Sequence, residues 1–449
     1  MTMNAFKILP LALGLLTACT LVQAKEDDPA RLDSALTPVG AERAGNADGS
    51  IPAWDGGMKP GAAPISASGD YSDPFADEQP LFVITNDNVA QYKDQLSPGQ
   101  QAMFARYLDY RMPVYPSHRS ATLPQTYLDK SRENLGKVTL SDNGNGLDGY
   151  EFGVPFPQPT EGLQVMWNHL TRYRGGSIRR EFASATVQET GDYTLVRSDG
   201  LTVFRENISD LDPSENVLLL NRVRTTAPSR YAGEVTLVHE PLNLAAGTRS
   251  AWRYNPGQRR VRRAPTVAYD SSARYSFGQV IADSVDGYNG APDRYDWKLQ
   301  GKREMLIPYN AYRVTSKQVK YRDLLTPGYL NPDHTRYEKH RVWVVEATLK
   351  MGVRHVYAKR RFYLDEDTWQ IVASDIYDSR GELWRSYESH IVMLHDIQLP
   401  MTAVEATYDL ISGRYAVNYL ANEVTSKAQF GETLSKSEFT PARLKRLGK

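Results

Sequence analysis

The chain has 449 residues, with 53 basic and 53 acidic residues, a formal net charge of zero and one cysteine, Cys19. A balanced charge argues against a nucleic-acid-binding protein, which normally presents a strongly basic face. A single cysteine excludes an intrachain disulfide and any metal site built from several cysteines.

Residues 1–24 have the pattern of a signal peptide that directs export. Lys7 precedes an apolar run from Ile8 to Ala18, which is shorter than the roughly 20 residues that span a bilayer. Two cleavage sites are possible: Leu16-Thr17-Ala18-Cys19 fits a lipobox, and Val22-Gln23-Ala24 fits the ordinary signal peptidase. The apolar character continues to Val22 and favours the later site. We therefore expect a periplasmic protein; the alternative is an outer-membrane lipoprotein anchored through Cys19.

Residues 25–80 are rich in Gly, Pro, Ala, Asp and Ser, as in "GNADGSIPAWDGG". This composition predicts turns and few regular elements. We expect an extended arm that Trp54 and Phe75 anchor to the body of the protein.

Residues 81–175 predict a helical segment. Ser97 followed by Pro98 and Gln100 is a capping box with proline at the first helical position. A second helix is predicted over 161–173, where apolar residues recur at helical spacing. These residues are Leu163, Met166, Trp167 and Leu170.

Residues 176–449 change to a period of two and predict a mainly β (α+β) fold. "DYTLVRSDGLTVFRE" (192–206) reads as two strands around Ser198-Asp199-Gly200. Strands at 249–255 and 258–264 form a hairpin around Asn255-Pro256-Gly257. An antiparallel sheet this long must curl or close. We expect this sheet to pack with 81–175 as one unit.

No motif in the chain predicts catalysis. "GNGLDG" (144–149) matches a dinucleotide-binding pattern, but the proline-rich segment behind it cannot form the required helix. It is interpreted as a surface loop. The eight histidines show no metal-binding spacing, and no G-x-S-x-G sequence occurs. We therefore expect no catalytic residue, no metal and no cofactor, although a metal site assembled from distant residues would have no such spacing.

Four arginines follow the hairpin turn: Arg259, Arg260, Arg262 and Arg263. On a strand, Arg260 and Arg262 share one face, and Arg259 and Arg263 share the other. Such a cluster is either a solvated surface or a clamp for anionic groups. We predict that one pair points toward the mouth of a cavity, and that Trp252 and Tyr254 share a face of the preceding strand.

Four blocks resemble one family: "LTPVGAERAGNADGSIPAWDGG" (36–57), "FPQPTEGLQVMWNHLTRYRG" (156–175), "AWRYNPGQRRVRRAPTVAYD" (251–270) and "GAPDRYDWKLQGKREMLIPYN" (290–310). The family comprises exported proteobacterial proteins of unknown function, often described as outer-membrane lipoprotein-sorting proteins. The resemblance implies a fold similar to the LolA/LolB lipoprotein carriers. That fold is a curved antiparallel sheet, forming an incomplete barrel, closed by helices over an apolar cavity.

The resemblance also implies a carrier or accessory protein for a lipidic or other hydrophobic molecule. Its expected partners are an inner-membrane RND-type transporter and an outer-membrane β-barrel protein. Two alternatives stay open, an enzyme acting on an envelope lipid or polymer and a structural partner of a transporter that binds no lipid. The candidate ligand-binding residues are Trp167, Trp252, Tyr254, Arg259, Arg260, Arg262 and Arg263.

Overall fold

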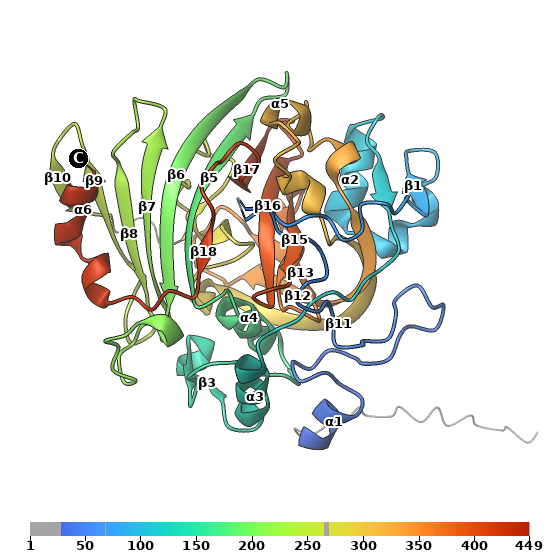
Figure 1. Ribbon diagram of the computed structural model, residues 1–449, viewed down its shortest axis with the longest axis horizontal. Coiled ribbons are helices and arrows are strands. Elements are labelled where there is room, and N and C mark those ends of the chain that lie inside the picture. The colour runs from blue at the N-terminus through green and yellow to red at the C-terminus, as the bar shows by residue number, and fades with distance from the viewer. Residues whose placement is uncertain (1–27, 68, 265–268, 449) are drawn as a thin grey trace, which may run out of the picture.

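The computed structural model describes residues 28–67, 69–264 and 269–448, and a sheet of 16 strands dominates it (Figure 1). From edge to edge the order is β1-β2-β12-β13-β14-β15-β16-β17-β5-β6-β7-β8-β9-β10, with β11 paired to β12 and β18 paired to β5. The edges β1 and β10 are not paired with each other, so the sheet does not close. The predicted incomplete barrel of mainly antiparallel strands is confirmed. One pairing departs from it, because β2 and β12 are parallel where Val114 meets Tyr337.

The strands fall into three groups along the chain. The first comprises β1 (Phe82–Ile84), β2 (Met112–Val114) and a separate hairpin of β3 (Thr139–Ser141) and β4 (Gly146–Asp148). The second comprises β5 (Ser177–Val187), β6 (Tyr193–Phe204), β7 (Leu219–Ala227), β8 (Val235–Glu240), β9 (Ser250–Asn255) and β10 (Arg260–Arg263). The third comprises β11 (Tyr295–Pro308), β12 (Tyr337–Leu349), β13 (Lys359–Asp365), β14 (Ile371–Tyr377), β15 (Leu383–Leu394), β16 (Leu399–Asp409), β17 (Tyr415–Leu420) and β18 (Gln429–Phe430).

Two expectations for short segments are wrong. Ser198, Asp199 and Gly200 lie inside β6 and form no turn, because all three residues pair with both β5 and β7. The pairing with β7 shifts register just before Ser198. A side chain at Gly200 would approach the ring of Phe182 on β5, so this glycine serves packing. "GNGLDG" is not a plain surface loop, since it contributes β4 and its Gly144 is buried.

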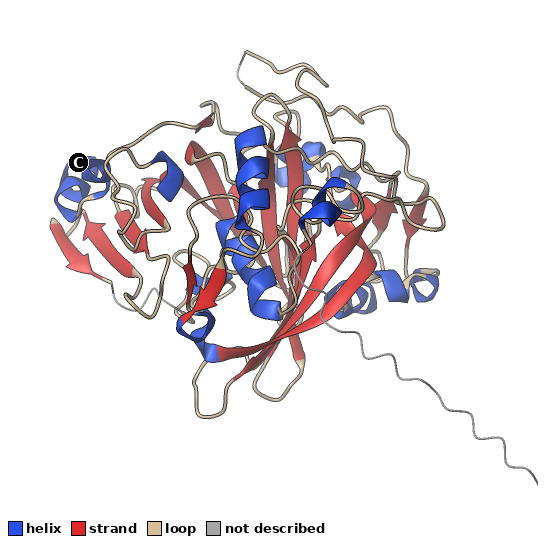
Figure 2. Ribbon diagram, turned by 90° about the horizontal axis from the view of Figure 1, so that it is seen from below, coloured by secondary structure: helices blue, strands red, loops and turns tan. Residues whose placement is uncertain are grey.

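The α-helices of the described residues are short. They are α1 (Pro29–Asp33), α2 (Pro98–Arg106), α3 (Gln125–Asn134), α4 (Gly162–Thr171), α5 (Tyr321–Leu324) and α6 (Pro441–Leu447). The predicted capping box begins α2: Ser97 accepts from the backbone of Gln100, and Gln100 accepts from the backbone of Ser97. Seen from below in Figure 2, helices lie in front of the middle of the sheet.

Helix α4 is buried on more sides than its sequence predicts. Met166, Trp167 and Leu170 are buried as expected, and Val165 and His169 on other sides of the helix are buried too. A helix that is buried nearly all round belongs to the core. Its Trp167 packs in one cluster with Val345, Phe362 and other residues of β12–β15. This packing of Trp167 therefore fixes α4 against the sheet.

Residues 28–67 and 69–80 run along the body with few regular elements. The indole nitrogen of Trp369 donates to the carbonyl of Val39 at 3.0 Å, and Phe75 stacks on His118 with ring centroids 4.2 Å apart. Trp54 lies under the guanidinium of Arg43, which belongs to the same segment. Both cleavage sites, Cys19 included, lie outside the described residues. Among the described helices, none has the length and apolar character needed to cross a membrane.

Candidate ligand-binding cavity

A cavity of about 430 Å³ lies against one face of the strands β5–β9. Alternate residues of these strands reach it because successive side chains of a strand point to opposite faces. On β7 the lining residues are Leu219, Asn221, Val223 and Thr225, and on β8 they are Thr236, Val238 and Glu240. The helix α4, residues 273–290 and the strands β16 and β17 contribute much of the remaining wall. The volume lies within the range of about 300–1,000 Å³ that small-molecule sites occupy.

Much of the wall is apolar and comes from separate parts of the chain. The apolar lining residues include Trp167 and Leu170 of α4, Phe182 of β5, Phe204 of β6 and Met401 of β16. Trp167 is 1% exposed, and its indole nitrogen donates to the carbonyl of Gly144 at 2.9 Å. The segment between β3 and β4 thus holds this ring in place. Such a wall suits a hydrocarbon body.

The lining also carries more cationic than anionic groups. Six arginines line the cavity, namely Arg172, Arg174, Arg180, Arg249, Arg253 and Arg274, against two carboxylates, Glu240 and Asp286. Arg249 pairs with Glu240, and Arg274 pairs with Glu234. Arg172 and Arg174 share Asp286, with nitrogen–oxygen distances of 2.5 and 3.2 Å.

Asp286 is held as an anion by these two arginines. Burial opposes its ionisation, but the guanidinium of Arg172 and the other nearby cations outweigh burial and lower its pKa to about 2. Burial and the neighbouring Arg172 in turn lower the pKa of Arg174 to about 10. One carboxylate is therefore shared by two guanidinium groups, and positive charge is left at this end of the cavity.

His169 of α4 positions Asp286. Its Nε2 atom bonds the carbonyl of Asp286 at 2.9 Å, and its Nδ1 atom accepts from the backbone of Ile371 at 3.2 Å. Burial, followed by the charge of Arg172, lowers the pKa of His169 to about 3. The ring is therefore neutral and links α4, the segment around Asp286 and the start of β14.

Arg180 and Arg253 are the two lining cations without an acidic partner. Among the residues that the structure describes, no carboxylate oxygen lies within 4.0 Å of either guanidinium. Arg180 lies over the ring of Tyr419, 3.9 Å from its centroid, and burial lowers the pKa of its guanidinium. The Nε atom of Arg253 is buried without a hydrogen-bond partner. Half-buried cations of this kind are open to an anion.

The structure brings one of the predicted site residues to the cavity. Trp167 lines it, whereas Trp252 and Tyr254 lie on the opposite face of β9, where they pack with residues of α6. Their predicted common face is confirmed.

The four hairpin arginines lie at the edge of the sheet, and all four are exposed. Arg262 is paired with Arg253, and Arg260 with Asn255, so Arg260 and Arg262 extend from the same face as the cavity-lining Arg253. Arg263 is paired with Trp252 and extends from the other face. None of the four is part of the cavity lining. A role in ligand binding for these arginines stays a prediction.

Arg180 and Arg253 were not candidates from the sequence. Each stands on a strand whose alternation is otherwise ordinary, whereas the arginines at 259–263 form a dense charge cluster. The available signal was weak: a strand face that carries Ile178, Arg180 and Phe182 places one cation between two apolar side chains. Which face of β5 is enclosed follows from the tertiary structure.

Comparisons with known proteins identify the family. Residues 83–445 match the family of proteins of unknown function DUF1329. The chain belongs to this family. A relative of the chain, the uncharacterized protein PA3922 of Pseudomonas aeruginosa, is 51% identical over 98% of this chain and 97% of its own length. The expected membership of a family of unknown function is thereby confirmed.

Two solved structures are similar to this chain at low sequence identity. A DUF1329 family protein from Desulfovibrio piger is 15% identical with a TM-score of 0.42, over 60% of this chain and 92% of its own. The LolA superfamily protein NE2245 from Nitrosomonas europaea is 13% identical with a TM-score of 0.38, over 63% of this chain and 98% of its own.

Proposed function

We propose that this protein is a carrier that binds an amphiphilic molecule with a hydrocarbon body and an anionic head group. The cavity on β5–β9 carries the proposal, because it combines an apolar wall with Arg180 and Arg253, two cations that lack acidic partners among the described residues. A neutral hydrophobic ligand would leave these cations desolvated and uncompensated. An anionic amphiphile matches both parts of the lining.

The energetics favour such a ligand. Each buried CH₂ group contributes about 0.8 kcal/mol, so an acyl chain against Trp167, Leu170 and Phe182 supplies most of the binding energy. A guanidinium binds carboxylate or phosphate oxygens through two parallel hydrogen bonds, which fixes the orientation of the head group. Arg180 and Arg253 stand on β5 and β9, with three strands between them, so one small head group binds one of them. We place it at Arg180 and the chain along α4, and Arg253 adds positive charge farther along the lining.

The proposed carrier hands its ligand between an inner-membrane RND-type transporter and the outer membrane, in the periplasm. The family resemblance supports this step, as does the export pattern of residues 1–24. A carrier needs no catalytic group, and the proposal assigns none. The outer-membrane β-barrel partner belongs to the same proposal.

Binding of palmitate and of hexadecanol tests the proposal, because these molecules share a chain length and differ in head-group charge. We expect the wild-type protein to bind palmitate more tightly, and the double variant Arg180→Gln/Arg253→Gln to lose that preference. The matched control is Arg260→Gln/Arg262→Gln, which removes two arginines from the same face of the sheet outside the cavity lining. Competitive displacement of a fluorescent fatty acid gives the affinities.

Two results would overturn the proposal. Failure of the wild-type protein to bind either molecule, with no lipid found by native mass spectrometry of protein purified from its own periplasm, would exclude an acyl-chain carrier. Equal loss of palmitate in the cavity variant and in the control variant would exclude the head-group site. Loss in the control variant alone would instead assign the clamp to Arg260 and Arg262.

A further inference from the structure

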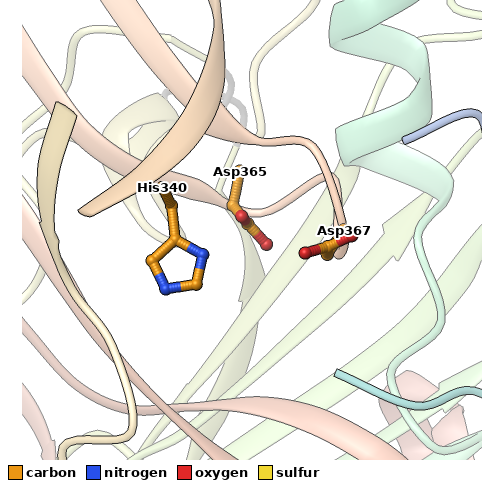
Figure 3. Close-up of side chains that lie close together, drawn as sticks. All are labelled: His340, Asp365 and Asp367. Atoms are coloured by element: carbon orange, nitrogen blue, oxygen red, sulfur yellow. The ribbon is translucent and has the colours of Figure 1, made fainter. Parts of the chain in front are cut away.

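A second site of unusual chemistry lies at the turn between β13 and β14, and its three side chains are not part of the cavity lining. His340 of β12, Asp365 at the end of β13 and Asp367 in the turn each offer a ligand atom, and these three atoms lie within 4.8 Å of one another (Figure 3). All three side chains are buried: His340 is 1% exposed, Asp365 0% and Asp367 5%. Strand pairing brings them together, since Val342 of β12 is the partner of Asp365.

Asp365 is a buried carboxylate without a cationic partner. Its Oδ2 atom accepts from the hydroxyl of Thr368 at 2.7 Å, and its Oδ1 atom is buried with no hydrogen-bond partner. The next two residues in the sequence are also acidic, but each has a cationic partner: Glu366 pairs with Lys302, and Asp367 pairs with Arg119. Within the described residues no cationic nitrogen lies within 4.0 Å of Asp365. A buried charge requires a counter-charge or a proton.

The imidazole of His340 is oriented for coordination. Its Nε2 atom bonds Glu338 Oε2 at 3.2 Å, and Figure 3 shows the Nδ1 edge of the ring facing the two aspartates. A histidine that donates one ring N–H to a carboxylate and offers its other nitrogen is the usual arrangement at a protein metal site. Tyr309 stacks on the same ring at 3.9 Å, and its hydroxyl is a second buried atom with no partner.

Asp367 keeps the capacity to bind a cation beside Arg119. Arg119 donates to Oδ1 at 2.7 Å and to Oδ2 at 2.9 Å. Each carboxylate oxygen has two acceptor sites, so these bonds leave a second lone pair on each oxygen. Ligand atoms at 2.0–2.2 Å from one ion in tetrahedral geometry lie about 3.3–3.6 Å apart. The widest pair of the three atoms, which lie within 4.8 Å of one another, therefore has to close by as much as about 1.5 Å when the ion binds.

We propose that His340 Nδ1 and one carboxylate oxygen from each of Asp365 and Asp367 bind a divalent first-row cation, Zn²⁺ or Mn²⁺. One imidazole with two carboxylates suits these ions better than the all-oxygen sets preferred by Mg²⁺ and Ca²⁺. The ion supplies the counter-charge that Asp365 lacks.

The position of this cation site indicates a structural role. The same turn holds residues of the N-terminal arm: the backbone of Glu42 donates to Glu366, and Trp369 donates to Val39. Arg119, which binds Asp367, also donates to the carbonyl of Arg43. An ion at the turn therefore fastens the arm to the sheet. It does not depend on the proposed ligand cavity.

The test measures metal binding by the full mature protein. After removal of metal with EDTA, we expect ZnCl₂ or MnCl₂ to raise Tm, with one equivalent bound by elemental analysis, and MgCl₂ to leave Tm unchanged. Asp365→Asn and His340→Gln should abolish the rise. Glu338→Gln should weaken binding by about 10–100-fold, because it removes the group that orients His340. His334→Gln is the control, since His334 lies in another segment, Pro332–His334.

A proton on Asp365 is the competing explanation, and the Asp365→Asn variant separates the two. If a proton neutralises Asp365, the EDTA-treated wild-type protein takes up none of the three cations, and the proposal fails. Uptake of one equivalent by Asp365→Asn or His340→Gln with unchanged affinity would also overturn it. Limited proteolysis supplies a second readout: added Zn²⁺ or Mn²⁺ should protect the arm at residues 36–54 in the wild-type protein and in His334→Gln. If Asp365→Asn does not fold, the metal uptake and Tm of His340→Gln are compared with those of the wild-type protein instead.

Discussion

The indole nitrogen of Trp167 donates to the carbonyl of Gly144, and this bond joins the helix α4 to the segment between β3 and β4. The ring lies in the apolar cluster of α4 and β12–β15 and also reaches the cavity wall. Trp167 is therefore part of both the hydrophobic core and the proposed ligand-binding site.

Replacing Trp167 should destabilise the protein strongly. Trp167→Ala removes a ring that is 1% exposed, and such truncations cost about 3–5 kcal/mol. Trp167→Phe keeps much of the apolar contact but leaves the Gly144 carbonyl without its donor, at a cost of about 1–3 kcal/mol. Urea unfolding measures both. Trp54→Ala is the control, because Trp54 is half-buried in the arm and should cost less.

Two substitutions of Arg180 should separate the contribution of its charge to palmitate affinity from that of its planar shape. Arg180→Lys keeps a positive charge but loses the planar pair of donors, so palmitate affinity should fall between those of the wild type and Arg180→Gln. The loss in Arg180→Gln should shrink at higher salt, since salt screens the charge contribution. Palmitate titrations at low and high ionic strength measure it. Identical affinities for Lys and Gln variants would show that charge at this position has no part in binding.

Asp286 should be needed for stability because it is the shared partner of Arg172 and Arg174. Asp286→Asn leaves two buried guanidinium groups without their carboxylate, and breaking a buried pair costs about 3–5 kcal/mol. The same change leaves more positive charge at the cavity, so palmitate affinity of the folded variant should rise. Asp296→Asn, at an exposed position of β11, should change neither quantity. Guanidinium unfolding and palmitate titration check the two effects separately.

Glu388 should make the stability of the protein depend on pH near neutrality. Burial raises the pKa of this carboxyl to about 7, although Gln100 and Tyr337 donate to its oxygens at 2.9 and 2.8 Å. The folded state then holds the proton more tightly than the unfolded state. Its contribution is full below the unfolded pKa, near 4.5, and is lost as pH rises through about 7.

The variant Glu388→Gln should remove this dependence. Between about pH 5 and pH 8, the unfolding free energy of the wild type should fall more than that of Glu388→Gln, by up to about 3 kcal/mol. Urea unfolding at the two pH values measures the difference. Glu382→Gln, at an exposed turn position, should behave like the wild type. An equal fall in Glu388→Gln and the wild type would assign the pH dependence to other buried carboxyls.

Local chemistry could be predicted from the sequence and distant pairing could not. The capping box at Ser97 and Gln100 acts within four residues, and the hairpin at 249–264 is set by its turn, so both were predicted correctly. Ser198-Asp199-Gly200 has the composition of a turn, but two neighbouring strands hold it extended. Tertiary pairing outweighed local preference there.

The functional side chains come from positions that no local pattern connects. Arg180 and Arg253 are 73 positions apart in the numbering, and β5 and β9 place them at one cavity. His340 and Asp365 meet through the register of β12 and β13, which depends on how the whole sheet is assembled. Sequence spacing reveals a metal site when one helix or loop supplies the ligands, and here separate segments supply them.

The strand β17 determines when the sheet becomes continuous. It pairs with β16 on one side and with β5 on the other, where Tyr415 meets Val187. In the described sheet this contact joins the early strands β5–β10 to the late strands β12–β16. Contacts between segments so far apart along the chain form slowly, because a long loop must close first. Until β17 pairs, β5 and β16 each have an unpaired edge, because the strand between them comes from residues near the end of the chain. We therefore expect the cavity wall to assemble late in folding.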